Sequence, residues 1–154
     1  MRQYGIIGWV IAQLVLNDWS AQVKYTPTKD KPLVKDEDGL GASGQLICSS
    51  VPGMILYLAI HTPPEITYAV TCCARYIFYS RHSHALALKS IGLYLKCTST
   101  KGLILIPSKD LWNICFYTYS DFTGIYIHEK TTDSSSINST TGYFVTFETF
   151  PVLW

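Results

Sequence analysis

One stretch of this chain has the layout that brings a carboxylate to a metal ion. Residues 114–118, Ile-Cys-Phe-Tyr-Thr, have the composition of a β-strand, and Tyr119-Ser120-Asp121-Phe122-Thr123-Gly124 follows them directly. A strand holds the side chain at its end in a fixed position, and Mg²⁺ prefers carboxylate oxygens as ligands. Asp121 is acidic, but Tyr119, where the predicted strand ends, is a phenol. Two-metal phosphodiester chemistry needs several converging carboxylates, so this stretch alone does not predict a working site.

Two histidines invite a metal interpretation. His82 and His84 flank Ser83, but side chains at i and i+2 of a helix do not face the same way. No third or fourth ligand stands at a suitable spacing. We expect a helix-start or surface role for both histidines, and neither a metal nor a cofactor.

The five cysteines indicate reduced thiols. Their number is odd and no Cys-x-x-Cys pair occurs, which favours an intracellular protein. The adjacent Cys72 and Cys73 are expected to supply small apolar side chains to a helix. Nucleophilic catalysis finds no support, because the chain lacks a Gly-x-Ser-x-Gly elbow.

Basic residues are concentrated between residues 65 and 101. That segment has a charge balance of +4, against −3 for residues 102–154 and a net charge of +1 for the chain. Its basic residues are Arg75, Arg81, Lys89, Lys96 and Lys101. They form either the solvated face of two helices or a surface that contacts phosphates. Phosphate contacts would make binding to DNA or an RNA–DNA hybrid weak, non-specific and salt-dependent.

Length and composition bound the architecture. The 154 residues suffice for one ordinary domain or for pieces of two, and 48% hydrophobic residues are enough for a core. The apolar run at residues 6–16 is shorter than the roughly 20 residues of a membrane span. Its apolar residues share one helix face: Ile7, Val10, Ile11, Leu14 and Val15. We expect a buried amphipathic helix, no membrane partner and a location in the cytoplasm or nucleus; a weak signal peptide with secretion is the alternative.

Helical signals follow up to about residue 98. Residues 24–45 are rich in charged residues, Pro and Gly, which predicts an exposed linker. A short buried helix within residues 45–60 has Pro52 near its first turn. Thr62-Pro63-Pro64-Glu65 is typical of a helix start with Thr62 as N-cap, and Ser83 is the candidate cap of a last helix. The residues expected to face the core are Met54, Leu56, Tyr57 and Leu58, then Ile66, Ala69, Val70, Cys73 and Ile77, then Ala85, Leu88, Ile91 and Leu95.

From Gly102 onward the pattern becomes that of strands. Residues 103–106 are Leu-Ile-Leu-Ile, stopped by Pro107, and a turn follows at residues 108–110. Residues 112–119 alternate, residues 129–141 form a Ser-, Thr- and Asp-rich loop, and residues 141–147 form a third strand. The predicted class is α+β, with helices first and then an antiparallel β piece that stops in mid-fold.

A series of short motifs runs along the chain. In the helical part they are Lys24-Tyr25-Thr26-Pro27, Lys35-Asp36-Glu37-Asp38-Gly39, Gly53-Met54-Ile55-Leu56-Tyr57-Leu58, Ile66-Thr67-Tyr68-Ala69-Val70, Cys73-Ala74-Arg75-Tyr76, His82-Ser83-His84, Ala87-Leu88-Lys89, Tyr94-Leu95-Lys96 and Lys101-Gly102-Leu103-Ile104-Leu105. In the β part they are Asp121-Phe122, Gly124, Thr141-Gly142-Tyr143 and Pro151-Val152-Leu153-Trp154. In this order and spacing they resemble the polyprotein of copia-type long-terminal-repeat retrotransposons, across the end of reverse transcriptase and the start of RNase H.

The resemblance implies two domain fragments. Residues 1–101 would be the end of reverse transcriptase, a thumb-like helical region with an exposed linker at about 24–45. Residues 102–154 would be the N-terminal fragment of an RNase H-like domain. The family's paired polymerase aspartates have no counterpart, since the chain contains no Asp-Asp pair.

The resemblance also assigns roles to the stretch at the end of the first long strand. In the family's Asp-x-Asp-(Trp/Phe)-x-Gly pattern, Tyr119 stands in place of the first, metal-binding Asp, and Asp121 retains the second. A phenol, which ordinarily ionises near pH 10, does not replace a carboxylate on Mg²⁺. Asp121 lies two residues on, roughly 6.6 Å along a strand, which is too far for a simple exchange of ligands.

We therefore expect thumb-like helices followed by an incomplete antiparallel sheet of RNase H-like type. The chain would be a truncated, catalytically inert remnant of such a polyprotein, a pseudoenzyme that lacks the Mg²⁺ of the intact family. The alternative is a non-catalytic module that binds nucleic acid or protein through the basic helices at residues 65–101. No small-molecule substrate is identified.

Overall fold

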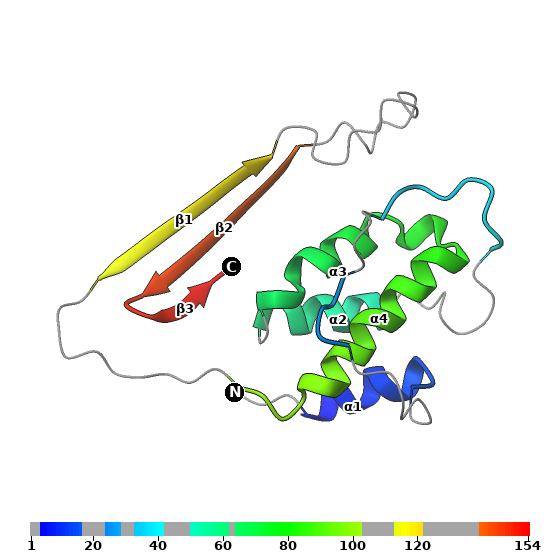
Figure 1. The fold of residues 1–154 in the computed structure, drawn as a ribbon, viewed down its shortest axis with the longest axis horizontal. Helices are drawn as coiled ribbons and strands as arrows, with labels where there is room; N and C mark the ends of the chain where they lie inside the picture. The colour runs from blue at the N-terminus through cyan, green and yellow to red at the C-terminus, as the bar shows by residue number, and fades with distance from the viewer. Residues whose placement is uncertain are drawn as a thin grey trace. The chain divides into compact units, whose positions relative to one another are not determined.

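The computed structural model describes residues 4–16, 24–28, 33–41, 50–61, 64–102, 113–121 and 139–154. The chain divides into two compact units, residues 1–102 and residues 103–154. The described part of the first unit contains four α-helices, and that of the second a three-stranded antiparallel sheet, so the fold class is α+β (Figure 1). Within these described ranges, no helix is long and apolar enough to cross a membrane.

Helix α1, Tyr4–Gln13, ends in a Schellman motif. The N–H of Val15 donates to the carbonyl oxygen of Ala12 at 3.1 Å, and the N–H of Leu16 donates to that of Ile11 at 3.0 Å. These two hydrogen bonds define a Schellman motif, in which a residue just after the helix end adopts a left-handed backbone conformation. Val15 supplies it with φ of 53°. Glycine is the usual residue here, so the valine is strained.

The Schellman turn changes which residues at the end of α1 reach the core. Ile7, Val10 and Leu14 are buried, as predicted. The prediction for Val15 is wrong, because its side chain is 65% exposed. The reversal of the chain at Val15 brings Leu16 into the core instead, where it is fully buried.

Helix α2, Ser50–His61, has no Lys, Arg, Asp or Glu, so the sequence does not mark its outer side. Pro52 lies in the first turn, as predicted. The buried residues are Val51, Pro52, Ile55, Leu58 and Ala59. The prediction for Leu58 is therefore confirmed. The prediction that Met54, Leu56 and Tyr57 face the core is wrong, because all three are exposed.

Helix α3, Thr67–Ala74, follows a 3-10 turn, η2, at Pro64–Ile66. The predicted cap Thr62 lies outside the described residues, and the residue before α3, Ile66, makes no side-chain capping bond. The predicted core residues Ile66, Ala69, Val70 and Cys73 are buried. Ile77, expected on the same face of a longer helix, lies instead in the short 3-10 turn η3, Ile77–Tyr79, and is half-buried.

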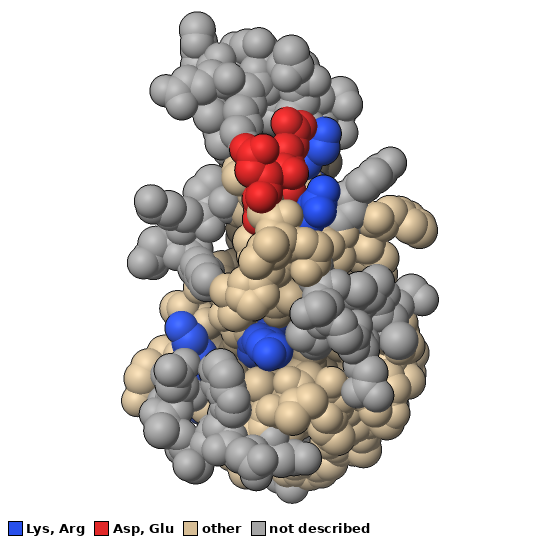
Figure 2. Space-filling model, turned by 90° about the vertical axis from the view of Figure 1, so that its right-hand side faces the viewer, with Lys and Arg blue, Asp and Glu red and all other residues tan. Residues whose placement is uncertain are grey.

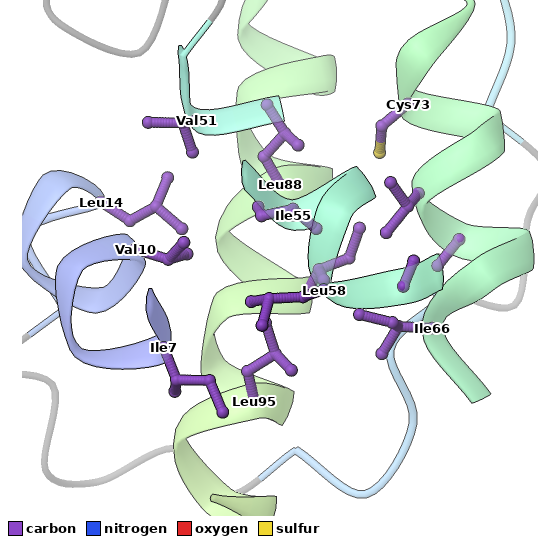
Figure 3. Close-up of a cluster of buried hydrophobic side chains, with 14 of the residues drawn as sticks. Ile7, Val10, Leu14, Val51, Ile55, Leu58, Ile66, Cys73, Leu88 and Leu95 are labelled. Atoms are coloured by element: carbon purple, nitrogen blue, oxygen red, sulfur yellow. The ribbon is translucent and has the colours of Figure 1, made fainter. Parts of the chain in front are cut away.

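Helix α4, His82–Thr98, packs against both α1 and α3. Its predicted apolar stripe is buried and consists of Ala85, Leu88, Ile91 and Leu95. Figure 3 shows how side chains such as Val10, Ile55 and Leu88 converge from different helices on one cluster. Burying this apolar surface is the main favourable contribution to the stability of the first unit.

Gly92 brings α4 close to the end of α1. A Cβ atom on Gly92 would lie 2.5 Å from Cδ1 of Leu14 and 2.7 Å from Cδ1 of Leu16. Real carbon atoms do not pack so closely, so this helix contact requires glycine. About one turn further along α4, Lys96 contacts the same end of α1. Two contacts therefore fix α1 against α4.

Residues 33–41, which we call the strap, lie against the start of α4 (Figure 1). The N–H of His82 donates to the carbonyl oxygen of Leu40 at 3.0 Å, and Gly41 forms an isolated antiparallel bridge with Arg81. Leu33 is half-buried and packs on the core. The strap is thus not the free linker that the composition of residues 24–45 suggests. Its partners lie 40 or more residues away in the sequence, so the composition of the segment could not reveal them.

The second unit contains strands β1, Ile114–Asp121, β2, Thr140–Phe147, and β3, Phe150–Leu153, in the order β1-β2-β3. The predicted strand at residues 141–147 is confirmed as β2, and the strand predicted at 114–118 continues to Asp121. Strand β3 was not predicted from the sequence. It contains Pro151, and its register with β2 shifts beside this residue. Proline is tolerated at such irregular or edge positions.

Both faces of the sheet carry aromatic or aliphatic side chains. Phe116 pairs with Val145 on one face, and Tyr117 pairs with Phe144 on the other, with ring centroids 6.2 Å apart. The side chains of Phe116 and Tyr117 are nevertheless exposed. Directly opposite aromatic and branched residues of this kind stabilise a two-strand pairing.

Some predictions concern residues outside the described ranges. They are the strand at 103–106, Pro107, the turn at 108–110, Pro63, Trp112, residues 122–124 and most of the loop at 129–141.

Candidate functional site

Tyr119 lies near the end of β1, in register with Gly142 of β2. Its side chain is 62% exposed. A Cβ atom on Gly142 would have no neighbour within 4 Å, so the space above this glycine is open. Tyr119 is thus held on a regular strand with its phenol accessible to solvent. A phenol in this position can donate or accept hydrogen bonds, but it offers no anionic oxygen to a cation at neutral pH.

Asp121 is the last residue of β1 and is in register with Thr140. Both Tyr119 and Asp121 belong to the strand, so their separation along the chain is two strand residues, about 6.8 Å. The sequence ended the predicted strand at Tyr119 and therefore missed that Asp121 also belongs to β1. On a regular strand, Asp121 is therefore too far from position 119 to serve as the metal ligand in its place.

The two histidines have different surroundings. His82 is exposed, whereas His84 is 3% exposed and contacts the backbone on both sides of its ring. The N–H of Arg81 donates to Nδ1 of His84 at 3.0 Å, and Nε2 lies 3.1 Å from the carbonyl oxygen of Val34. The predicted helix-start role is confirmed for His84. Ser83 is not the cap, because its hydroxyl donates to Oδ2 of Asp36 at 2.6 Å.

Potential metal ligands do not gather in the part of the chain that the structure describes. Among those residues, no group of three or more His, Cys, Asp or Glu could hold a metal ion. The four described cysteines are free thiols: Cys72, Cys73, Cys97 and Cys115. Burial raises the pKa of the Cys73 thiol to about 12, with a smaller contribution from neighbouring Cys72. Both are buried, so the predicted apolar role is confirmed and Cys73 is chemically inert at neutral pH.

Lys96 has a structural partner. Its ammonium donates from Nζ to the carbonyl oxygen of Leu16 at 2.7 Å. This carbonyl lies just beyond the end of α1, so Lys96 ties the segment that leaves α1 to α4. We predicted Lys96 as a contact for nucleic acid. That contact stays a prediction, and the structure shows in addition that this ammonium joins the end of α1 to α4.

The other basic residues are spread along the helices rather than gathered at one point. Arg81 precedes α4, Lys89 lies near its middle, and Lys101 is exposed beyond its end, while Arg75 follows α3. From Arg81 to Lys96 the helix rises about 22 Å. On the face drawn in Figure 2, Lys and Arg appear as separate spots and the acidic side chains gather in one group. On that face, the described basic residues form no concentrated patch.

Sequence reasoning missed the contacts around Asp36. Its carboxylate accepts from Ser83, and the Ser83 hydrogen bond is the main cause that lowers the pKa of Asp36, with further lowering from the Gly39 backbone, His84 and Arg81. A Cβ atom on Gly39 would clash with this carboxylate, so a larger residue there would displace the Asp36 side chain. The pattern Asp-x-x-Gly was the available signal, but nothing in it identifies Ser83 as the partner.

Comparison with known proteins gives two curated relatives. The chain is 28% identical over 135 residues to the retrovirus-related Pol polyprotein from transposon RE1 of Arabidopsis thaliana. The matched segment covers 88% of this chain and 8% of that protein. It is 27% identical over 138 residues to the corresponding polyprotein from transposon RE2 of the same plant. That matched segment covers 90% of this chain and 9% of the polyprotein. No family model and no solved structure matches. The predicted resemblance is thus confirmed: over nearly its whole length, this chain is similar to a short segment of retrovirus-related Pol polyproteins of plant retrotransposons.

Proposed function

We propose that this chain is a catalytically inert remnant of a copia-type polyprotein. Residues 1–101 would derive from the end of reverse transcriptase, and residues 102–154 from the start of an RNase H-like domain. The order of helices followed by an antiparallel sheet is compatible with this division, and the similarity to two Pol polyproteins supports the origin. The chain spans less than a tenth of the length of either relative.

The residue at position 119 is the observation on which the lack of catalysis depends. RNase H chemistry requires carboxylates that converge on two metal ions. In the proposed alignment the first of them is replaced by Tyr119, which lies on a regular, exposed strand. Asp121 is displaced from that position by two strand residues, so it would need a rebuilt strand to act in its place. We accordingly propose no Mg²⁺ or other cofactor for this chain.

A cleavage assay tests this proposal. The purified chain is incubated with an RNA–DNA hybrid whose RNA strand is end-labelled, with and without Mg²⁺, beside its Asp121→Asn variant. We expect no Mg²⁺-dependent shortening of the RNA by either protein. Degradation that Mg²⁺ stimulates and that Asp121→Asn abolishes would contradict the proposal, whereas degradation that the variant retains would indicate a contaminating nuclease.

The second candidate is a non-catalytic module that binds nucleic acid through residues 65–101. The excess of basic over acidic residues in this segment favours it, with Lys101 exposed and Lys89 half-exposed on the helical unit. Binding would rest on phosphates, so it would be weak, indifferent to sequence and sensitive to salt. A protein partner at the same helices remains the other form of this candidate. Either role would be exercised in the cytoplasm or nucleus, in keeping with the free thiols.

Fluorescence anisotropy with a labelled RNA–DNA hybrid at several salt concentrations tests the binding candidate. Lys89→Met and Lys101→Met together should weaken binding and reduce its salt dependence. Lys24→Met, which removes a charge outside the segment, is the matched control and should bind as the unmodified chain does. The absence of salt-dependent binding at micromolar protein would rule out this candidate.

A further inference from the structure

His84 joins two segments that lie about 50 residues apart in the sequence. Its Nδ1 accepts the backbone N–H of Arg81 at 3.0 Å, just before α4 begins. Its Nε2 lies 3.1 Å from the carbonyl oxygen of Val34 in the strap. The ring of Tyr76 stacks on the imidazole with centroids 4.6 Å apart and an angle of 7°. The imidazole is therefore enclosed, with its two nitrogens each next to one backbone group.

These two contacts determine the protonation state of the ring. A nitrogen that accepts a hydrogen bond from a backbone N–H cannot itself hold a proton, so Nδ1 is bare. A carbonyl oxygen can only accept, so Nε2 must hold the proton and donate it to Val34. The closed arrangement is thus satisfied by the neutral imidazole with its proton on Nε2. A second proton, on Nδ1, would point at the N–H of Arg81 and place two donors against each other.

Besides the contact with His84, the strap is held by the packing of Leu33 on the core, by the bridge from Gly41 to Arg81 and by separate hydrogen bonds. Ser83 donates to Asp36, Tyr76 Oη lies 3.5 Å from the carbonyl oxygen of Leu33, and His82 N–H donates to Leu40. Each is a single hydrogen bond, and such bonds contribute only about 1 kcal/mol each. Along the strap, exposed and half-exposed residues predominate. A change at His84 can therefore alter the whole segment.

The charged groups near His84 act in opposite directions. Asp36, on the strap, interacts electrostatically with both His84 and Arg81, and Tyr76 covers the ring. The carboxylate of Asp36 attracts an imidazolium, whereas the guanidinium of Arg81 repels it. Lys35 and Glu37, on either side of Asp36, pair with each other at 2.9 Å. The carboxylate of Asp36 is shared with Ser83, the Gly39 backbone and Arg81, whereas the hydrogen-bond conflict at Nδ1 acts on the imidazolium directly.

We propose that the strap is a pH-sensitive latch, whose closure over the start of α4 requires the neutral imidazole of His84. Protonation at Nδ1 breaks the bond from Arg81 and opens residues 33–41, while the buried cluster of α1, α2 and α4 stays folded. Opening also moves the carboxylate of Asp36 away from Arg81. This latch does not depend on the proposed origin or on any binding to nucleic acid.

Nuclear magnetic resonance of the ¹⁵N-labelled full chain tests the latch. At pH 7.5 the ring shifts of His84 should identify a bare Nδ1 and a protonated Nε2. Lowering the pH to 5.5 should move the amide resonances of residues 33–41 toward those of an open segment and leave those of α2 unchanged. Once the open form takes up a proton at this histidine, the closing constant should fall up to about tenfold per pH unit. Asp36 stays ionised throughout, because its pKa lies below its ordinary value of 3.8.

Two substitutions separate His84 from the rest of the chain. His84→Asn keeps an acceptor for the N–H of Arg81 but has no titratable ring, so the strap should lose its response between pH 7.5 and 5.5. His82→Asn removes an exposed histidine two residues away and should keep the response. A protonated Nδ1 in the unmodified chain, strap amides that do not move while His84 titrates, or a full response in His84→Asn would each overturn the latch. If His84→Asn does not fold, the ring shifts and amide titration of the unmodified chain still decide.

Discussion

Lys96 Nζ lies 2.7 Å from the carbonyl oxygen of Leu16, eighty residues earlier in the chain. Helices α1 and α4 are thereby joined by a charged donor on α4 and a backbone acceptor just beyond the end of α1. Hydrogen bonds from charged groups are worth about 1.5–3 kcal/mol when well formed, and this one is partly exposed. The contribution of the Lys96–Leu16 bond to the free energy of unfolding should therefore lie toward the lower end of this range.

Lys96→Met should therefore destabilise the first unit by about 1.5 kcal/mol, because it keeps the aliphatic stem but leaves the Leu16 carbonyl without this donor. Urea unfolding followed by circular dichroism measures the change. Lys101→Met, which removes an exposed lysine beyond α4, is the matched control and should have no measurable effect. Equal destabilisation by the two variants would show that the Leu16 bond contributes nothing specific.

Val15 offers the clearest opportunity to stabilise the chain. It has φ of 53° and an exposed side chain, so its replacement by Gly or Asn relieves backbone strain while losing little buried surface. We expect Val15→Gly and Val15→Asn to raise the free energy of unfolding by about 0.5–1 kcal/mol. Val15→Ala removes the same methyl groups but keeps a Cβ atom, so it should gain less. A larger gain for Ala than for Gly would contradict the assignment of a left-handed helix end.

Two glycines in helices should respond in opposite ways to the same substitution. Gly92→Ala places a Cβ atom 2.5 Å from Leu14 and should destabilise the helical unit by about 1–3 kcal/mol through overpacking. Gly8→Ala adds a methyl group to an exposed position of α1 with no neighbour within 4 Å, and should stabilise by up to about 1 kcal/mol. Thermal unfolding of both variants checks the pair. Stabilisation by Gly92→Ala would mean that α1 and α4 are not in close contact there.

Cys73 should make the stability of the chain fall in alkaline solution. Desolvation by burial raises the pKa of this thiol to about 12, above its ordinary value of 9.0, so the folded state favours the neutral form. Its contribution is fully present below pH 9 and is lost as the pH rises from 9 toward 12, because the unfolded chain releases the proton first. The stability of the unmodified chain minus that of Cys73→Ala should decline over this range.

Thiol labelling gives an independent check on Cys73. In the native state at neutral pH, exposed Cys97 should react quickly with a maleimide and buried Cys73 should react only after unfolding. Peptide mass spectrometry after brief labelling identifies the modified sites. Rapid native labelling of Cys73 would contradict its burial.

Local patterns were sufficient for much of this protein. The apolar stripes of α3 and α4 are buried as their spacing predicts, and residues 141–147 form a strand. These predictions succeed because a helix or strand that is apolar on one side can bury only that side. The identity of Tyr119, and with it the proposal of an inert remnant, is likewise a property of the sequence.

Where local patterns failed, the cause was a missing or distant partner. Helix α2 has no Lys, Arg, Asp or Glu to mark its outer side, so only packing against its neighbours could leave Tyr57 exposed and bury Ile55. The composition of the strap is that of a free linker, yet Asp36 and Val34 find partners at Ser83 and His84. The sequence suggests that Lys96 is a basic residue on the surface, whereas in the folded chain the Leu16 carbonyl lies beside its ammonium. The sequence thus determined which segments are helical or extended, whereas tertiary structure decided which polar groups are paired, because hydrogen bonds form only between atoms that folding has brought together.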